Sequence, residues 1–295
     1  AVTRWCHIPK VEIAAVCDVS KDVAEEVARH VEQLGKPRPK VYWGETAYKE
    51  LCQQQGVNLV YVCTDWMSHV PIAIHAMEQG RSVAVEVPAA LTLKDIWMLI
   101  DTAEQTRQHC MMLENAVYDR FEMAVCQMVH EGLLGELVHV EGGYAHPIGD
   151  RWTAWRMEYS RLNAGDIYPT HSIGPVCRLL DIHRSDRMHY LTAMQTNAFK
   201  GAEMYQEVMG KACDSFANGD QTSTMIRTVK GKTMLIQHNV MTPRPYNRMF
   251  QAVGTQGYAA KYPVPEVQLS PEMAAKVGIE MEDDKLPLNA SQIET

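Results

Sequence analysis

Short apolar runs and longer amphipathic segments alternate along the first 115 residues of the chain. Expected strands lie at residues 11–18, 57–64, 82–86 and 110–114, and expected helices at residues 21–34, 70–79 and 93–106. Strand and helix patterns that alternate in this way are typical of a parallel sheet covered by helices. The sequence therefore predicts an α/β, doubly wound first domain at residues 1–115.

After residue 115 the pattern changes to longer strand-like runs. Expected helices lie at residues 120–130 and 172–180, and expected strands at residues 137–145, 187–199, 222–229, 232–240 and 248–253. A tight-turn signal such as Lys230-Gly231 between two of these runs favours antiparallel pairing. We therefore predict an α+β domain with a mostly antiparallel open sheet at residues 116–262. Residues 150–170 are expected to be irregular, and residues 263–295 to form an irregular tail.

The composition narrows the class of protein. The chain has 295 residues, of which 46% are hydrophobic, and a formal net charge of −8. No apolar run approaches the ~18 residues that a membrane-spanning helix needs, so no membrane segment is predicted. An acidic chain without clustered Lys and Arg is not expected to bind nucleic acid. The eight cysteines form no C-x-x-C pair and the twelve histidines show no metal-ligand spacing, so free thiols and no metal site are predicted.

Asp18 ends the first expected strand. An acid at the end of the second strand of a dinucleotide-binding fold accepts hydrogen bonds from the adenosine ribose and favours NAD over NADP. The alternative is an ordinary helix-capping acid. A glycine-rich phosphate loop should precede such an acid by ~20 residues, but the chain contains no G-x-G-x-x-G. We therefore expect the first strand and its glycine loop, about 25–30 residues, to be missing from the N-terminus. Because an export signal would lie there, the compartment is left unpredicted.

Polar side chains follow the next three expected strands. Trp66 and His69 come after the second strand, Glu86 and Val87 lie at the end of the third, and Asn115 follows the fourth. The carboxyl ends of parallel strands form the ligand side of an open sheet, so these residues are expected to line a nicotinamide or ribose pocket. The alternative is that Trp66 belongs to the core and His69 to a helix surface.

Aromatic and basic residues gather in the second domain. Tyr144 ends a strand, Arg156 closes the R-W-T-A-W-R run, and Tyr168 and His171 stand three apart at a helix start. Aromatic rings beside arginines suit a carbohydrate, whose apolar faces stack on rings and whose hydroxyls accept charged hydrogen bonds. The alternative for Tyr168 and His171 is a capped helix entrance. The loop that carries Tyr246 is expected to be either a pocket wall or a plain connection.

Taken together, the motifs of this chain resemble a known family. They are C-D at 17–18, T-x-W-x-x-H at 64–69, E-V-P at 86–88, L-E-N at 113–115, GDIYPTHSIG at 165–174, GDQT at 219–222 and PRPY at 243–246. In this order, and over residues 11–258, they are similar to glycoside hydrolase family 109, the NAD-dependent α-N-acetylgalactosaminidases of the glucose–fructose oxidoreductase/inositol dehydrogenase superfamily. Most dehydrogenases of that superfamily have Glu-Lys-Pro at the positions of Glu-Val-Pro, residues 86–88 of this chain, so that Val87 replaces the lysine. The missing lysine favours the hydrolase branch.

The resemblance implies redox-assisted hydrolysis of a terminal N-acetylhexosaminide with retention of configuration. NAD would oxidise C3 of the sugar, a base would remove the acidified C2 proton, the C1 substituent would leave, and water addition and re-reduction would follow. By motif position, the residues implied for NAD are Asp18, Trp66, His69, Glu86, Val87 and Asn115. Those implied for the sugar are Tyr144, Arg156, Tyr168, Pro169, Thr170, His171 and Tyr246. His171 and Tyr168 are the expected catalytic residues, with Tyr118 as a further candidate for the base.

Two other functions stay open at this stage. One is an NAD-dependent sugar dehydrogenase of the same superfamily. The other is a truncated homologue without catalysis, which the absent glycine loop favours; the chain also appears shorter than the family at its C-terminus. The open sheet of the second domain favours a homodimer, because exposed sheets are often buried against a partner.

Overall fold

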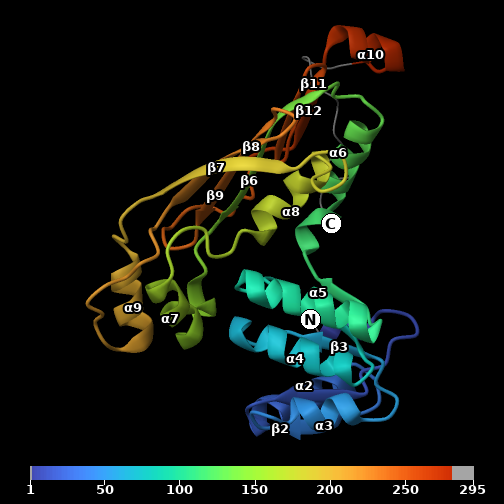
Figure 1. Ribbon diagram of the computed structural model, residues 1–295, viewed down its shortest axis with the longest axis vertical. Coiled ribbons are helices and arrows are strands. Elements are labelled where there is room, and N and C mark those ends of the chain that lie inside the picture. The colour runs from blue at the N-terminus through green and yellow to red at the C-terminus, as the bar shows by residue number, and fades with distance from the viewer. Residues whose placement is uncertain (1, 281–295) are drawn as a thin grey trace. The chain divides into compact units, whose positions relative to one another are not determined.

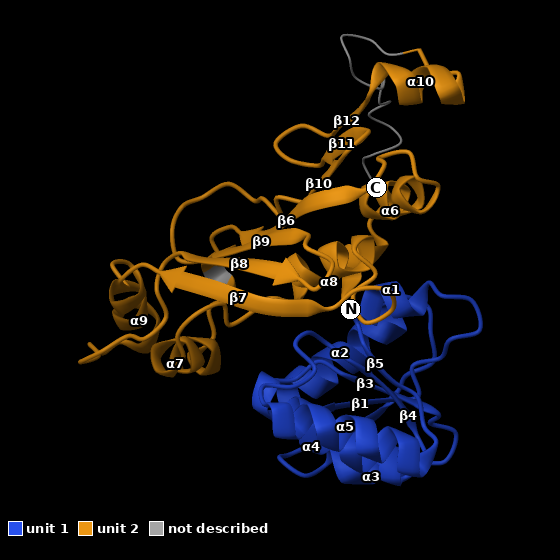
Figure 2. Ribbon diagram, turned by 45° about the horizontal axis from the view of Figure 1, so that its top comes forward, with its two compact units in different colours: residues 1–113 blue, residues 114–295 orange. Residues whose placement is uncertain are grey.

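The computed structural model describes residues 2–280. The chain divides into two compact units, with the boundary between Leu113 and Glu114 (Figure 2). Each unit has its own hydrophobic core, so each is described by itself.

Unit 1 contains short parallel strands covered by helices. Its elements are α1 Val2–Cys6, β1 Ala15–Asp18, α2 Lys21–Gln33, β2 Lys40–Trp43, α3 Tyr48–Gln53, β3 Leu59–Val62, α4 Trp66–Glu78, β4 Ser82–Val85, α5 Leu93–Thr106 and β5 Cys110–Met112. All strand pairs in this unit are parallel, in the orders β1-β2 and β3-β4-β5. The predicted parallel α/β fold is confirmed. Among residues 2–280, no hydrogen-bonded ladder joins β1 to β3.

Side-chain caps fix where the helices of unit 1 begin. The side chains of Ser20, Asp65 and Thr92 accept backbone N–H groups in the first turns of α2, α4 and α5. Such caps satisfy donors that the helix itself leaves open. The cap at Asp65 starts α4 four residues earlier than the apolar pattern predicts, and so brings Trp66 into its first turn.

Unit 2 is built on one seven-stranded sheet. Its elements are the 3-10 helix η1 Asn115–Tyr118, α6 Arg120–His130, β6 Leu137–Ala145, the 3-10 helix η2 Gly149–Arg151, α7 Ala154–Leu162, α8 Thr170–Leu179, β7 Met188–Gln195, α9 Gly201–Met209, β8 Thr222–Thr228, β9 Thr233–Asn239, β10 Gln251–Gly254, β11 Gly257–Ala260, β12 Glu266–Leu269 and α10 Pro271–Val277. The strand order is β12-β11-β10-β6-β9-β8-β7, and only the β6–β9 pair is parallel. The predicted, mostly antiparallel sheet is confirmed.

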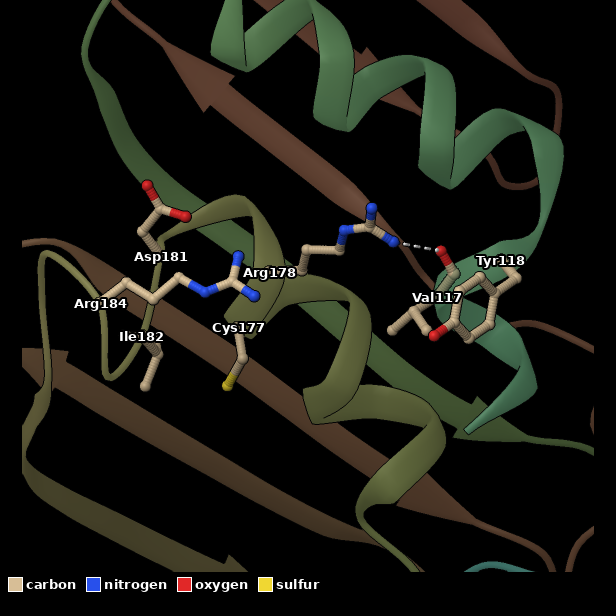
Figure 3. Close-up of a pocket in the computed structure, with 7 residues that line it drawn as sticks. All are labelled: Val117, Tyr118, Cys177, Arg178, Asp181, Ile182 and Arg184. Atoms are coloured by element: carbon tan, nitrogen blue, oxygen red, sulfur yellow. Dashed lines mark hydrogen bonds between the residues drawn. The ribbon is translucent and has the colours of Figure 1, made fainter. Parts of the chain in front are cut away.

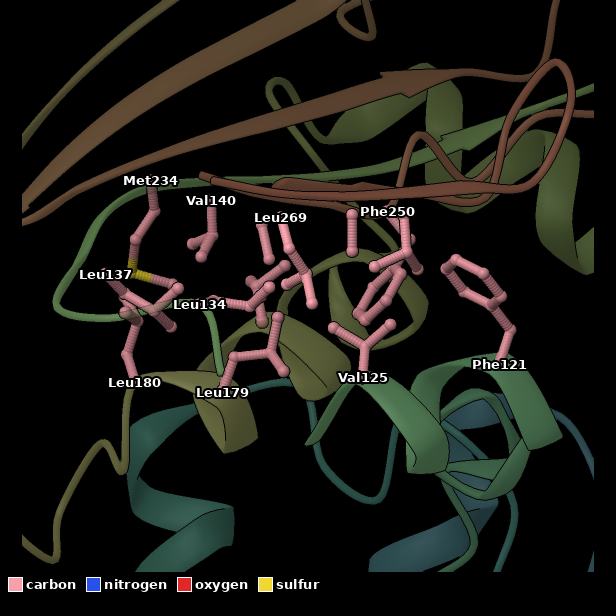
Figure 4. Packing of buried hydrophobic residues seen from close by; sticks show 14 of the residues in the cluster. Phe121, Val125, Leu134, Leu137, Val140, Leu179, Leu180, Met234, Phe250 and Leu269 are labelled. Carbon is pink, nitrogen blue, oxygen red and sulfur yellow. The ribbon is translucent and has the colours of Figure 1, made fainter. Parts of the chain in front are cut away.

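Helices α6 and α8 pack on one face of this sheet (Figure 1). Val140 and Met234 point from neighbouring strands toward Val125 of α6 and Leu179 of α8, and all four side chains are buried (Figure 4). Alternate strand residues face the helices because side chains on a strand alternate between the two faces. All residues of β7 except Met188 are exposed, Tyr190 among them.

The structure corrects two predictions of irregular chain. Residues 150–170 contain helix α7, which the mixed aromatic and basic sequence did not suggest. Residues 266–277 form β12 and α10, where Ser270 caps a helix that has Pro271 in its first turn. Proline fits the first helical turn because the backbone N–H that it lacks would have no partner within the helix there. Residues 281–295 of the expected tail lie outside the described residues.

Candidate functional site

A carboxylate and an imidazole form the centre of the site in unit 2. His171 lies in the first turn of α8, and its Nδ1 is 2.7 Å from Oε1 of Glu114. The same Oε1 accepts the backbone N–H of Ala116 at 2.9 Å. Both side chains are buried, at 9% and 7% exposure. A carboxylate in this position fixes the tautomer and the orientation of an imidazole ring, so that Nε2 is the nitrogen left for proton transfer.

Close packing of α8 on β6 fixes the position of His171. Gly142 of β6 faces Ser172, and a Cβ on Gly142 would overlap the carbonyl oxygen of Ser172. Gly174 similarly faces the Glu114 side chain, with a hypothetical Cβ 2.9 Å from Cγ of Glu114. At Gly142 only glycine permits this close approach of helix and strand, because a Cβ would push the backbones apart. At Gly174 a Cβ would displace the Glu114 side chain.

Tyr144 is surrounded by other aromatic side chains. Its ring centroid lies 5.0 Å from His171, 5.2 Å from Tyr168, 4.7 Å from His146 and 6.3 Å from His238. Tyr168 and His171 also meet edge to face at 5.0 Å. The structure thus brings together three of the residues expected for the sugar, and adds two histidines that the sequence analysis did not single out.

Burial and nearby arginines act on the pKa of the Tyr144 hydroxyl in opposite directions. Burial and Tyr246 raise the pKa of Tyr144, while Arg248, Arg151 and Arg156 lower it, and the net shift is upward. Arg156 itself lies 4.2 Å from the Trp155 ring and bonds Thr153 Oγ1 at 3.3 Å. Tyr144 is therefore a hydrogen-bond donor near neutral pH, with the arginines available to stabilise negative charge that develops nearby.

The segment before α8 carries a buried acid. Asp166 accepts the backbone N–H of Tyr168 at 3.1 Å through Oδ1. Its Oδ2 is buried without a hydrogen-bond partner among the described residues, as is Oγ1 of Thr170. Burial raises the pKa of Asp166 to about 6. Pro169 precedes α8 as its N-cap residue and offers no side-chain hydrogen bond.

His238 lies behind Tyr144 on strand β9. It is 2% exposed, and its Nδ1 has no hydrogen-bond partner in the part of the chain that the structure describes. Burial, reinforced by His146, lowers the pKa of His238 to about 4. The ring is therefore neutral at physiological pH, which keeps positive charge away from this side of Tyr144.

Tyr246 borders the same cluster from the loop after β9. Its ring lies 5.3 Å from His146 and 6.1 Å from Tyr262, and 47% of the residue is exposed. The loop thus places an exposed tyrosine beside the buried aromatic cluster. That it forms a wall of the site stays a prediction.

Tyr118 lies elsewhere. It is 54% exposed and lines a separate open pocket of about 400 Å³ with Val117, Cys177, Arg178, Asp181, Ile182 and Arg184. Figure 3 shows Arg178 donating to the carbonyl oxygen of Val117 beside it. Arg178 is two helical turns beyond His171 on α8, about 10 Å along the axis. The structure therefore does not bring Tyr118 into the aromatic cluster.

The residues expected for NAD lie mostly at strand ends of unit 1. Asp18 ends β1 and accepts the backbone N–H of Ser20 at 2.8 Å. Glu86 follows β4 and accepts the hydroxyl of Tyr61. Val87 is buried at 3% exposure. Asn115 opens η1 in unit 2, immediately after Glu114, and is exposed.

His69 and Trp66 are both buried in unit 1. Nδ1 of His69 lies 2.8 Å from the carbonyl oxygen of Pro88, and Nε2 lies 3.2 Å from that of Thr64. The imidazole therefore connects the chain segments that follow β3 and β4. The alternative of a solvent-facing histidine does not hold, whereas Trp66 at 7% exposure matches the core alternative.

Sequence reasoning missed the partner of His171. Glu114 was noted only as part of the L-E-N motif, because 57 residues separate it from His171 and no spacing rule joins them. His238 and Arg248 lie inside strand or loop patterns that give no signal of function. In residues 2–280, no group of three or more His, Cys, Asp or Glu side chains is arranged to hold a metal ion, and no helix is long and apolar enough to cross a membrane.

Two family models match the chain. The oxidoreductase family, NAD-binding Rossmann fold, matches residues 2–114, and the glycosyl hydrolase 109 C-terminal domain matches residues 149–277. A glycosyl hydrolase family 109 protein 1 from Bacteroides thetaiotaomicron is 50% identical over 276 residues, which cover 92% of this chain and 59% of that protein. A glycosyl hydrolase family 109 protein from Porphyromonas gingivalis is 48% identical over 295 residues, which cover 98% of this chain and 62% of that protein. The chain thus spans about three fifths of these relatives' length.

Solved structures share the fold at low identity. An NAD-binding oxidoreductase from Klebsiella pneumoniae aligns with a TM-score of 0.73 at 18% identity, over 96% of this chain and 72% of that chain. A myo-inositol dehydrogenase from Lactobacillus casei, solved with NAD(H) and myo-inositol, aligns with a TM-score of 0.68 at 17% identity, over 88% of this chain and 69% of that chain.

The fold and the first family match define a class of chain in which a domain of the NAD-binding Rossmann fold precedes an open-sheet domain. Within that class, the chain is similar to glycosyl hydrolase family 109 proteins over nearly its whole length. Its residues 149–277 match that family's C-terminal domain, as the motif resemblance predicted.

Proposed function

We propose that this chain carries the catalytic site of an NAD-dependent glycosidase that hydrolyses terminal N-acetylhexosaminides, with α-N-acetylgalactosaminide as the substrate. The observation that carries the proposal is the buried Glu114–His171 pair, which lies against Tyr144 and Tyr168 in unit 2. A proton-transfer pair bordered by aromatic rings suits a sugar whose hydroxyl must lose and regain a proton.

The residues of unit 1 fit a dinucleotide at its adenosine ribose. One oxygen of Asp18 accepts the N–H of Ser20, and no other hydrogen bond to this carboxylate is found in residues 2–280. The second oxygen is therefore available to a ribose hydroxyl, and the negative charge opposes a 2′-phosphate. We assign Asp18 to the ribose, and Glu86, Val87 and Asn115 to the remaining contacts. When bound, NAD supplies the hydride acceptor and donor at C3 of the sugar.

His171 is assigned to the C3 hydroxyl proton. With Nδ1 held by Glu114, Nε2 accepts that proton and returns it later, while the carboxylate stabilises the imidazolium that forms. Tyr168 is assigned to the C2 proton, as proposed from its motif position. Arg156 supports this step because its positive charge favours an ionised tyrosine nearby.

The sugar is proposed to lie against Tyr144 and Tyr246, with Pro169 and Thr170 at the start of α8 lining the same site. The buried Oγ1 of Thr170 has no hydrogen-bond partner in the described residues. It is therefore available to bond a ligand hydroxyl or a water molecule. His69 and Trp66 are buried, and we assign His69 to holding the segments around the cofactor rather than to contacting it.

The test is release of p-nitrophenol from α- and β-linked N-acetylgalactosaminide and N-acetylglucosaminide, with and without NAD, while absorbance at 340 nm is followed. Release that requires NAD without net NADH supports the glycosidase and identifies its sugar. Accumulation of NADH with free sugar would instead indicate a dehydrogenase. Absence of both signals would contradict an active glycosidase in this chain.

A homodimer is the proposed assembly. Tyr190, Met194 and Met225 lie on the face of the sheet opposite to the buried Ile226, and they are 57%, 74% and 45% exposed. Apolar side chains gathered on one sheet face favour burial against a second copy. Light scattering during size-exclusion chromatography tests this, and a monomeric mass at micromolar concentration would contradict it.

A further inference from the structure

Arg248 contacts Tyr246 through two different interactions. Its Nε–H donates a hydrogen bond to the Tyr246 hydroxyl oxygen, and its guanidinium carbon lies 5.6 Å from the centroid of the same ring. A guanidinium donates hydrogen bonds but accepts none. The hydrogen of the Tyr246 hydroxyl therefore cannot turn toward Arg248 and is left for another acceptor.

The Arg248 side chain is held from the opposite side by a charged network. It is 12% exposed, and its Nη1 lies 3.7 Å from Oδ2 of Asp119. Asp119 in turn lies 3.0 Å from Nζ of Lys261, which also pairs with Glu122 at 2.7 Å. Glu122 is only 2% exposed, so this end of the network is anchored inside the unit. The guanidinium is thus confined between Asp119 and Tyr246.

The backbone of Arg248 is fixed as firmly as its side chain. Its carbonyl oxygen accepts the N–H of Gly143 at 2.6 Å, next to Tyr144 in β6. Met249 follows in a left-handed conformation with φ of 62°, and its N–H bonds Oδ1 of Asn247 at 2.5 Å. A non-glycine residue keeps such a conformation only where its surroundings hold it. Arg248 therefore connects the strand of Tyr144 with the hydroxyl of Tyr246.

We propose that Arg248 is a positioning residue that fixes the Tyr246 hydroxyl as a hydrogen-bond donor toward an oxygen of the bound sugar. This assignment rests on the proposed function in one respect, namely that Tyr246 meets the sugar. The class of ligand group follows from the chemistry: with one lone pair taken by Arg248, the hydroxyl presents its hydrogen to a carbonyl or hydroxyl oxygen. Arg248 itself does not contact the substrate.

The first experiment needs no enzymatic activity. In protein labelled with ¹³Cζ-tyrosine, the Tyr246 resonance is assigned by its loss in Tyr246→Phe. We expect Arg248→Gln and Arg248→Lys to shift this resonance, because each removes the Nε–H donor. Arg227→Gln, which changes an exposed arginine of β8, is the matched control and should leave it in place. An unshifted Tyr246 resonance in both Arg248 variants would overturn the proposal.

The second experiment is a double-mutant cycle in the glycosidase assay. Tyr246→Phe and Arg248→Lys should each raise KM about tenfold with a smaller change in kcat, and the double variant should resemble Tyr246→Phe alone. Multiplication of the two single effects would show that Arg248 does not act through Tyr246. If the wild-type chain shows no hydrolysis, the proposed function fails, whereas the resonance experiment still decides whether Arg248 holds Tyr246. Arg248→Lys keeps a positive charge beside Asp119, so a folded protein is expected.

Discussion

Oε1 of Glu114 lies 2.7 Å from Nδ1 of His171, although 57 residues separate the two in sequence. The pair joins the start of η1 to the start of α8 within unit 2. Since both side chains are buried, their hydrogen bond is shielded from water and its geometry is fixed. Since Glu114 holds Nδ1, the imidazole has Nε2 left for a ligand bound beside Tyr144 and Tyr168.

Glu114→Gln tests this relationship directly. The amide keeps the shape and the contact with Ala116 but removes the charge that stabilises a protonated imidazole. We expect a loss of about 10²-fold or more in kcat with little change in KM, as for orienting carboxylates in other proton-transfer sites. The measurement is steady-state kinetics in the glycosidase assay that tests the proposed function. A Glu114→Gln variant with wild-type turnover would show that the carboxylate has no part in orienting His171.

A second prediction compares two adjacent glycines of β6. Gly142→Ala should destabilise unit 2 by about 2–4 kcal/mol, because the new Cβ overlaps a backbone oxygen of α8 that cannot move without the helix. Gly143→Ala is the matched control. Its Cβ meets Cγ and Sδ of Met249 at 2.8 and 2.9 Å, and a flexible side chain can turn away. Urea unfolding measures both, and equal losses for the two variants would contradict the argument.

The third prediction concerns pH. The pKa of His238 is about 4 in the folded chain, below its usual 6.5, so the unfolded chain binds this proton first and stability is lost as the pH falls from about 6.5 to about 4. The pKa of Asp166 is raised from 3.8 to about 6, so its protonation stabilises the fold as the pH falls from about 6 to about 4. Each of the two titrations changes the free energy of unfolding by roughly 3 kcal/mol, and the two changes have opposite signs.

Variants separate the two groups. Asp166→Asn should be more stable than the wild type at pH 7 by up to about 3 kcal/mol, with an advantage that disappears toward pH 4. His238→Phe should not show the loss of stability that His238 causes at low pH. The stability of this variant relative to the wild type therefore rises as the pH falls below 6.5. Differences in unfolding free energy between variant and wild type, taken at several pH values, cancel the titration of all other acids. Parallel curves for Asp166→Asn and the wild type would rule out this assignment of the proton.

His69 provides the fourth prediction. His69→Ala removes the ring N–H that donates to one of the two nearby carbonyl oxygens, those of Pro88 and Thr64, and it removes a buried ring. We expect unit 1 to lose about 2–4 kcal/mol of stability. His7→Ala, at an exposed position, is the control and should change stability by less than about 0.5 kcal/mol. A variant of His69 that unfolds like the wild type but binds NAD more weakly would identify the ring as a cofactor contact instead.

Local patterns in the sequence predicted much of the fold. All the parallel strands of unit 1 except β2 Lys40–Trp43, and the long strands of unit 2, were predicted because their apolar runs are distinct. Helix α7 was missed because its polar and aromatic residues pack against α9 and not along one apolar stripe. Strand β12 and helix α10 were missed because prolines and charges interrupt the pattern. The candidate site followed from motif resemblance at Tyr168 and His171, whereas Glu114 and Arg248 act through partners that only folding brings near.

Gly142 also has a consequence for how the site can vary. Since α8 rests directly on β6, the position of His171 is set by the sheet and does not depend on the path of residues 146–165, which connect the strand to the helix. The exposed positions of that connection can therefore change in sequence while the Glu114–His171 pair stays in place. Under the proposed function, recognition of the substrate can vary there separately from proton transfer.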